Sequence, residues 1–249
     1  MRRLFFGSFL LLCLGIFSSS CQSPMSEGNL NDLSAMDLRI DITQDLTNQR
    51  KNEVTVFIID ENGKPIRNKA VKLKVNGHDL AYSERQELYY TTSSKYSGTD
   101  IPVEQEYNFQ IVLSNGKTCF LGRITPLPEN NEQYIVCAGK GDFNRDFVVS
   151  WKNLKDIDRL SVTKGVLLRT STDQLQNHDF EPQVNKDIGA YGTYTLSKSQ
   201  FTSSKSTISS LKLTFSATKY GLMNPRLLKG SEIRISGHID RYVEFDGKQ

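Results

Sequence analysis

Apolar and polar residues alternate along most of the chain beyond residue 36. In the stretch DLRIDIT, Leu38, Ile40 and Ile42 fall on one face, and charged or polar residues fall on the other. A period of two predicts β-strands with one buried side, and helical spacing of apolar residues is nearly absent. The strands expected before residue 139 are DLRIDIT, EVTVFIID, AVKLKVNG, ELYYTT, EYNFQIVL, TCFLGRI and QYIVCA.

Turn residues separate these stretches at short intervals. ENGKPIRNK and SNGK carry Asn-Gly pairs, which favour tight turns between strands. Many short strands at this spacing predict an all-β chain with two tandem β-sandwich domains, 37–139 and 140–249, joined at CAGKGDFNRD. The strands expected in the second domain are FVVSWKN, RLSV, GVLLRT, YGTYTLS, SSLKLTFSAT, SEIRISGHI and RYVEF.

Two segments of the first predicted domain resemble known β-sandwich modules. DENGKPIRNKAVKLKVNG is similar to the opening of bacterial immunoglobulin-like and carboxypeptidase-regulatory-like modules. IPVEQEYNFQIVLSNGK resembles the tyrosine corner of fibronectin type III domains, with Ile101 six places before Tyr107, although Val103 takes the family's proline position. Both likenesses imply an architecture and say little about activity.

The N-terminal segment has a different pattern. Arg2 and Arg3 precede an apolar run from Leu4 to Phe17, about fourteen residues, whereas a membrane-spanning helix needs roughly twenty. A charged start, a short apolar stretch and an exit of small residues are typical of a secretory signal. The exit SSSC resembles the lipobox of bacterial lipoproteins, with the departure that Ser18 stands where leucine is usual.

This resemblance implies that residues 1–20 are a removed signal peptide and that Cys21 carries acyl chains, which makes membrane lipid a partner. The alternative is an ordinary secretory signal cut near Ser20, which leaves Cys21 unmodified. Residues 21–36 are polar and lack a sustained period, so we expect a flexible, lipidated tether. The relaxed lipobox resembles Bacteroidetes lipoproteins, and Gln22 in a weakly acidic context favours the periplasmic face of the outer membrane over the cell surface.

The charge balance argues against nucleic acid as a partner. The chain has 31 Lys+Arg and 28 Asp+Glu residues, and Arg2 and Arg3 leave with the signal. The remaining charges are interspersed, whereas a nucleic-acid surface needs basic residues clustered on one face.

Two cysteines, Cys119 and Cys137, lie in the predicted sandwich. If TCFLGRI and QYIVCA pair as a hairpin, Leu121 faces Ile135 and the two cysteines face each other, close enough for a disulfide. An oxidising compartment allows such a bond to form. The alternative is two buried free thiols, and the absence of a CxxC pair argues against a metal site.

The sequence contains no recognisable catalytic or cofactor motif. It lacks GxSxG, HExxH, a P-loop and GxGxxG, so we expect no cofactor, no metal and no catalytic residues. His78, His178 and His238 each lie near an aspartate, but turn positions explain these pairs better than catalysis does. GDFNRD is similar to half of a calcium loop, yet Phe147 and Asn153 stand where an EF-hand needs Gly and Glu, which favours a polar linker.

The stretch AYSERQELYYTTSSKY concentrates aromatic residues. They form either a platform on which a glycan stacks or half-buried strand residues, the more common use of tyrosine. Together with the lipid anchor and the likeness to spacer and adhesive modules, this predicts a non-catalytic binding or scaffold lipoprotein whose ligand is a glycan or an envelope protein. The candidate ligand-facing residues are Tyr82, Tyr89, Tyr90 and Tyr96.

Two alternatives remain. Fimbrillin-type pilins of Bacteroidetes resemble this layout, and in them cleavage at a basic residue removes the first strand and opens a groove for a neighbour's strand. Arg50, in TNQRKNEV, is placed for such a cut. The second alternative is a β-sandwich hydrolase or a metal-dependent enzyme.

We expect mass spectrometry of the native membrane fraction to find an acylated Cys21 as the mature N-terminus. Cys21→Ser should release the protein from membranes, because the acyl chains supply the anchor. A variant that stays membrane-bound would contradict lipidation. A mature terminus at Lys51, with high-mass polymer on a gel, would favour the pilin alternative instead.

Overall fold

The computed structural model describes residues 30–86, 92–168 and 178–245. These residues form β-strands joined by turns, with 3-10 helices η1 (Leu33–Ala35), η3 (Glu132–Tyr134) and η4 (Lys198–Gln200) and no α-helix among them. The all-β prediction is therefore confirmed. Across this part of the chain, no helix has the length and apolar character needed to cross a membrane.

Among the described residues, the largest sheet has nine strands. Its strands are antiparallel neighbours except where β17 meets β1 and β10, which it joins in parallel. From edge to edge the order is β13 (His178–Asp187), β12 (Arg159–Leu168), β15 (Ser206–Tyr220), β17 (Glu232–Phe245), β1 (Asp37–Asp45), β2 (Asn48–Ile59), β6 (Thr92–Thr99) and β5 (Ala81–Gln86), with β10 (Lys140–Gly141) beside β17 off this path.

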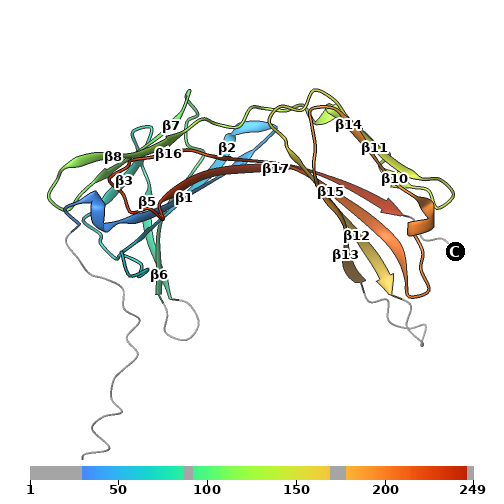
Figure 1. The fold of residues 1–249 in the computed structure, drawn as a ribbon, viewed down its shortest axis with the longest axis horizontal. Coiled ribbons are helices and arrows are strands. Elements are labelled where there is room, and N and C mark those ends of the chain that lie inside the picture. Colours follow the sequence, from blue (N-terminus) through green and yellow to red (C-terminus); the bar gives the residue numbers. More distant parts are fainter. Residues whose placement is uncertain (1–29, 87–91, 169–177, 246–249) are drawn as a thin grey trace, which may run out of the picture.

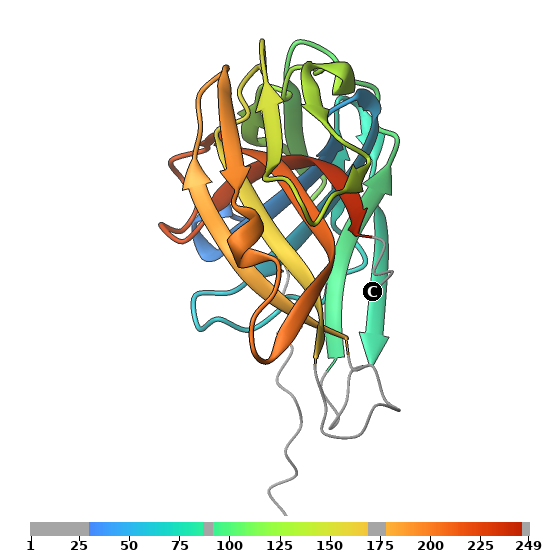
Figure 2. The ribbon, with the colours of Figure 1, turned by 90° about the vertical axis from the view of Figure 1, so that its right-hand side faces the viewer.

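Smaller sheets cover the upper face of the large sheet in Figure 1. We call the part of the molecule that holds β1, β2, β6 and β5 of the large sheet the first half, and the part that holds β13, β12 and β15 the second half. Over the first half, the strand order of the smaller sheet is β16 (Leu222–Met223), β8 (Thr118–Ile124), β7 (Tyr107–Val112), β3 (Lys72–Val75) and β4 (His78–Asp79). Over the second half, the order is β14 (Gly192–Leu196), β11 (Phe147–Trp151) and β9 (Ile135–Cys137). Figure 1 shows the large sheet arching beneath the two smaller sheets. Figure 2 shows the same layers from the side of the second half.

The division expected between residues 139 and 140 does not separate two sheets. β17 pairs with β1 over residues 232–236 and with β15 over residues 234–244. β9 lies in the sandwich of the second half, and β16 pairs with β8 of the first. Alternation shows which side of a strand is buried but not which strand lies beside it. The sequence pattern therefore missed that β9, β16 and β17 pair with strands across the expected boundary.

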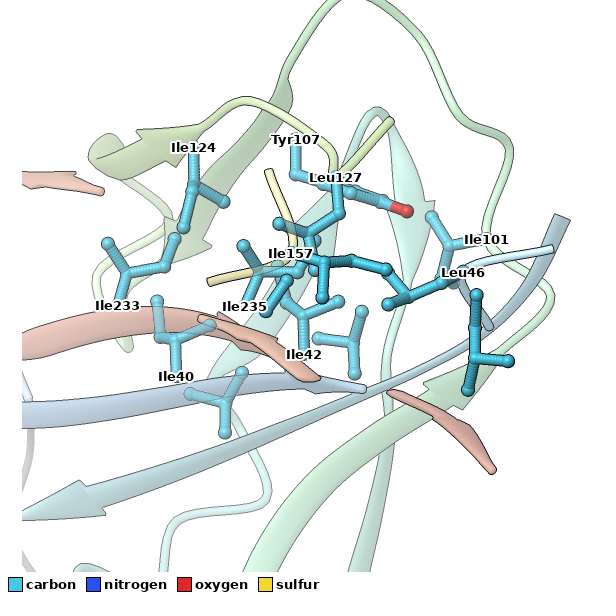
Figure 3. Close-up of a cluster of buried hydrophobic side chains, with 14 of the residues drawn as sticks. Ile40, Ile42, Leu46, Ile101, Tyr107, Ile124, Leu127, Ile157, Ile233 and Ile235 are labelled. Atoms are coloured by element: carbon cyan, nitrogen blue, oxygen red, sulfur yellow. The ribbon is translucent and has the colours of Figure 1, made fainter. Parts of the chain in front are cut away.

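The apolar core continues through the region where β1 ends at Asp45 and β17 runs on into the second half, which we call the waist. Gly237 allows the close approach there, because a Cβ atom at this position would clash with the Gln44 carbonyl and the Leu46 side chain. Full burial of each large aliphatic side chain contributes about 1.5–3 kcal/mol. Figure 3 shows core side chains from both halves meeting: Ile40, Ile42, Leu46, Ile101, Tyr107, Ile124, Leu127, Ile157, Ile233 and Ile235.

The hairpin on which the predicted disulfide depends does not form. Cys119 lies in β8 opposite Ile111, and Cys137 lies in β9 opposite Val149. These strands belong to different sheets, and both cysteines are free thiols. The predicted bond is wrong for this structure, because the chain between the two strands crosses from one sandwich to the other instead of closing a hairpin.

The tyrosine-corner likeness holds for burial but not for hydrogen bonding. Ile101 and Tyr107 are both buried. However, the Tyr107 hydroxyl has no hydrogen-bond partner, and burial raises the pKa of this group to about 12. In contrast, the hydroxyl of buried Tyr96 donates to the Asn68 carbonyl at 3.0 Å.

We expect Tyr107→Phe to leave the free energy of unfolding unchanged or to raise it by up to about 1 kcal/mol, because a buried hydroxyl without a partner is removed. Tyr96→Phe is the matched control and should lower the free energy by about 1 kcal/mol, since a buried carbonyl loses its donor. Urea unfolding compares the two variants. An equal loss at both positions would contradict the unpartnered state of Tyr107.

Candidate functional site at the waist

An open hollow of about 620 Å³ lies at the waist. The β1–β2 hairpin forms one wall, the end of β6 forms another, and β17 forms the third. The main polar lining residues are Thr43, Asp45, Lys51, Glu53, Asp100, Glu132, His238 and Asp240. We call this feature the waist hollow.

Two buried amide side chains hold the walls of the waist hollow. Gln44 donates to the Leu127 carbonyl at 2.7 Å and accepts from the Leu127 amide at 3.2 Å. Asn52 does the same with Ile101, at 2.9 Å and 3.0 Å. Each side-chain amide thus pairs with both the backbone N–H and the backbone C=O of one residue in a neighbouring segment. Buried backbone groups need such hydrogen-bond partners. The lining side chains therefore project from a rigid frame.

The β1–β2 turn is set by Asp45. Its carboxylate accepts hydrogen bonds from the amide and the hydroxyl of Thr47, at 2.8 Å and 2.7 Å, in an Asx-type turn. Burial raises the pKa of Asp45, but the Thr47 hydrogen bonds and the nearby Lys51 outweigh it and hold the pKa below its ordinary value. The turn therefore presents an ionised carboxylate at the hollow.

Asp240 is the most connected side chain of the lining. Its carboxylate accepts from the Thr214 hydroxyl at 2.7 Å and the Tyr242 hydroxyl at 3.3 Å, and it pairs with Lys212 at 3.0 Å. Burial raises the pKa of Asp240, and the bonds from Thr214 and Lys212 more than offset this, so the net pKa is lowered. Lys212 also lies 5.5 Å from the centre of the Tyr242 ring. Asp240 thus stays charged and fixes an exposed aromatic ring beside the hollow.

The lining carries more acidic than basic groups. Asp45, Glu53, Asp100, Glu132 and Asp240 face it. The basic groups of the lining are Lys51 and, when protonated, His238. Glu132 pairs with Arg241 at 2.9 Å on the rim. The hollow therefore suits a ligand that donates hydrogen bonds or carries positive charge.

The waist hollow lacks the arrangement that nucleophilic catalysis needs. His238 is exposed, and its Nε2 atom lies 3.8 Å from the Asp240 carboxylate, beyond hydrogen-bond distance. His78 is exposed on β4 and His178 begins β13, so the histidines lie on different elements. Among the described residues, no group of three or more His, Cys, Asp or Glu side chains is arranged to hold a metal ion.

A second hollow of about 610 Å³ adjoins the first and shares Thr47 and Glu132 with it. The Asn130 side chain accepts from the Lys155 amide at 2.7 Å and donates to the Lys155 carbonyl at 3.1 Å, which ties the two halves together. The two hollows therefore meet at Thr47 and Glu132, and the crossing segment lines the second one.

The tyrosine platform is only partly within the described residues. Tyr89 and Tyr90 lie outside them, as does the predicted lipidation residue Cys21. The Tyr82 and Tyr96 rings lie 5.1 Å apart, and Tyr96 is 3% exposed. Burial raises the pKa of Tyr96 to about 12, and it raises that of Tyr82 further, with the Glu84 hydrogen bond contributing. These two rings therefore pack into the first half rather than presenting a free surface.

The acidic residues of GDFNRD, the stretch similar to half of a calcium loop, make turn and loop contacts. The Asp142 carboxylate accepts from the Asn144 amide at 2.8 Å, and the Asp146 carboxylate accepts from the Lys198 amide at 2.8 Å. Lys198 also donates its ammonium group to the Asn144 carbonyl at 3.2 Å. These contacts agree with the preferred interpretation of a polar linker.

Sequence reasoning missed the lining of the waist hollow. Its members come from separate stretches, and apart from His238 and the neighbouring Asp240, each appears in the sequence as an ordinary polar position of a strand or turn. The one available signal was the period-two pattern, which places His238 and Asp240 on the same exposed face of one strand. The pairing of β1 with β17 was needed to bring Asp45 and Glu53 beside them.

No family model matches the sequence, and no curated protein matches it. Solved structures show distant likeness. The Yersinia pseudotuberculosis adhesin InvE is 12% identical, with a TM-score of 0.25, over 88% of this chain and 60% of the adhesin. A chain of a cytokine receptor complex is 10% identical, with a TM-score of 0.22, over 72% of this chain and 91% of that one.

Another is Bacteroides ovatus SGBP-B of a mixed-linkage glucan utilization locus, solved in complex with a mixed-linkage heptasaccharide. It is 11% identical, with a TM-score of 0.20, over 89% of this chain and 64% of SGBP-B. The chain thus spans less than two thirds of the adhesin and of SGBP-B. At these TM-scores the likenesses carry no argument about function.

We expect Asp240→Asn to lower the free energy of unfolding by up to about 1 kcal/mol near neutral pH and by nothing in acid. The folded pKa is lowered, so the ionised carboxylate stabilises the fold above the unfolded pKa, and this is lost as the pH falls through the folded value. Urea unfolding across this range measures the difference. Asp187→Asn, at an exposed pair with Arg159, is the control and should change little. A loss that is independent of pH would contradict this role of the Asp240 charge.

Proposed function

We propose that the chain is a non-catalytic binding or scaffold lipoprotein of the outer membrane, anchored through Cys21 and facing the periplasm. The observation that carries the proposal is the waist hollow. It is polar and open, its walls are held by buried amides, and it lies on a sheet shared by both halves. Such a frame supports recognition because little ordering is required when a ligand arrives.

The lining supports a ligand rich in hydrogen-bond donors. Carboxylates at Asp45, Glu53 and Asp100 accept from sugar hydroxyls or from lysine and arginine side chains. The Tyr242 ring, 64% exposed beside Asp240, offers a surface on which a sugar or a guanidinium group can stack. A neutral glycan or a basic segment of an envelope protein fits this chemistry, whereas an anionic glycan is repelled.

The pilin alternative has one structural feature to test. β1 lies between β17 and β2, and Arg50 is exposed near the start of β2. Cleavage there would remove Leu38, Ile40 and Ile42 from the core and open two strand edges at once. The scaffold proposal requires β1 to stay in place.

We expect the chain beginning at Gln22 to bind neutral glycans on an array, or to cross-link to an envelope protein through a photoreactive residue at Thr99. Glu53→Gln with Asp100→Asn should weaken either interaction about tenfold, because charge-assisted hydrogen bonds are lost. The matched control is Asp179→Asn with Asp187→Asn on β13, which makes the same charge change away from the waist.

Equal binding by both double variants would contradict a site at the waist. Release of shortened sugars from a bound glycan would contradict the absence of catalysis. Failure of both the array and the cross-link would contradict a binding role at the hollow.

A further inference from the structure

The chain enters the fold at the far end of the first half. Leu30 is buried, and its carbonyl accepts from the Ser114 amide at 3.0 Å. Leu30 lies nine positions after Cys21 in the sequence. At the maximum of about 3.4 Å per residue, this segment spans at most about 31 Å. A lipid on Cys21 therefore keeps this end of the molecule within about 31 Å of a bilayer.

Two turns contact the entering chain at this end, and a third is bonded to one of them; the blue coil in Figure 1 marks the place. The Asn68 side chain donates to the Ser114 hydroxyl at 3.0 Å, which joins segments 60–71 and 113–117. The Leu228 amide donates to the Met36 carbonyl at 2.9 Å, which joins segment 224–231 to the entering residues. We call the surface formed by residues 30–36, 60–71, 113–117 and 224–231 the entry surface.

The entry surface carries an excess of positive charge. Two of its arginines are paired, Arg67 with Glu84 at 2.8 Å and Arg226 with Asp32 at 2.9 Å. Its acidic residues are Asp32, Asp60 and Glu61, and its basic residues are Lys64, Arg67, Lys69, Lys117, Arg226 and Lys229. The Asp60 carboxylate is turned onto the Asn62 and Lys64 amides, at 2.9 Å and 2.8 Å. Four exposed lysines thus project from turns around the point where the chain enters.

We propose that the entry surface docks onto anionic phospholipid, with Lys64, Lys69, Lys117 and Lys229 contacting the headgroup phosphates. The proposal rests on the lipidation proposed at Cys21, which brings this end within reach of the membrane. Lysines near an anionic bilayer are attracted to it, and the attraction decays over a Debye length of about 8 Å at physiological salt. Docking therefore fixes which end of the molecule faces the membrane, and it leaves the second half extending away.

Vesicle binding tests the surface without its anchor. The chain beginning at Gln22 retains every described residue, and it should bind vesicles containing phosphatidylglycerol at low salt but not phosphatidylcholine vesicles. Replacing the four lysines by glutamine should weaken binding at least tenfold, because each lysine near an anionic surface contributes up to about 1 kcal/mol. The matched control replaces Lys152, Lys186, Lys198 and Lys205, four exposed lysines of the second half, and should change binding less than twofold. Equal loss in both variants, or equal binding to both vesicle types, would overturn the proposal.

Lysine footprinting tests the surface in the native, lipidated protein and needs no variant. Acetylation followed by mass spectrometry should find the four entry-surface lysines protected in phosphatidylglycerol vesicles relative to detergent, and the four control lysines unchanged. Uniform labelling would overturn the docking even if Cys21 is acylated. If Cys21 is not acylated, the vesicle experiment still decides whether the surface recognises anionic lipid, so the two failures are distinguishable.

Discussion

The pairing of β1 with β17 is the contact on which the rest of the molecule depends. A strand inside a sheet must satisfy backbone groups on both sides, and β1 does so with β2 on one side and β17 on the other. Because β17 also pairs with β15 and β10, this contact joins four strands of the first half to five of the second in one sheet. Without it, the apolar sides of Ile40 and Ile233 would face water, and the walls of the waist hollow would not meet.

Local alternation was enough to predict the fold class and most strands, because the period of two depends only on neighbouring residues. DLRIDIT and SEIRISGHI alternate as expected, with Leu38, Ile40 and Ile235 buried. The neighbours of each strand could not be predicted in the same way. Nothing in DLRIDIT indicates that its partner is about two hundred positions away, since pairing is chosen by total burial over the whole chain.

The same limit explains the errors at the candidate sites. The disulfide prediction assumed that the strands of Cys119 and Cys137, adjacent in sequence, form a hairpin, but the chain between them changes sandwich. Tyr82 and Tyr96 lie in β5 and β6, outside the expected strand ELYYTT. Which side of these strands is buried depends on the sheet that covers them. The waist residues Asp45 and Glu53 carried no signal, because a polar side chain on the exposed face of a strand looks the same with or without a neighbour across a hollow.

The order of strands also determines when the sheet can be completed. The first described strand pairs with the last, so β1 lacks one neighbour until nearly the whole chain has been synthesised. Loop closure over such a distance is costly, and contacts of this kind slow folding. Until then, β1 and β2 present an open edge that other chains can pair with. A chaperone that covers this edge until β17 arrives would meet a requirement that the topology itself imposes.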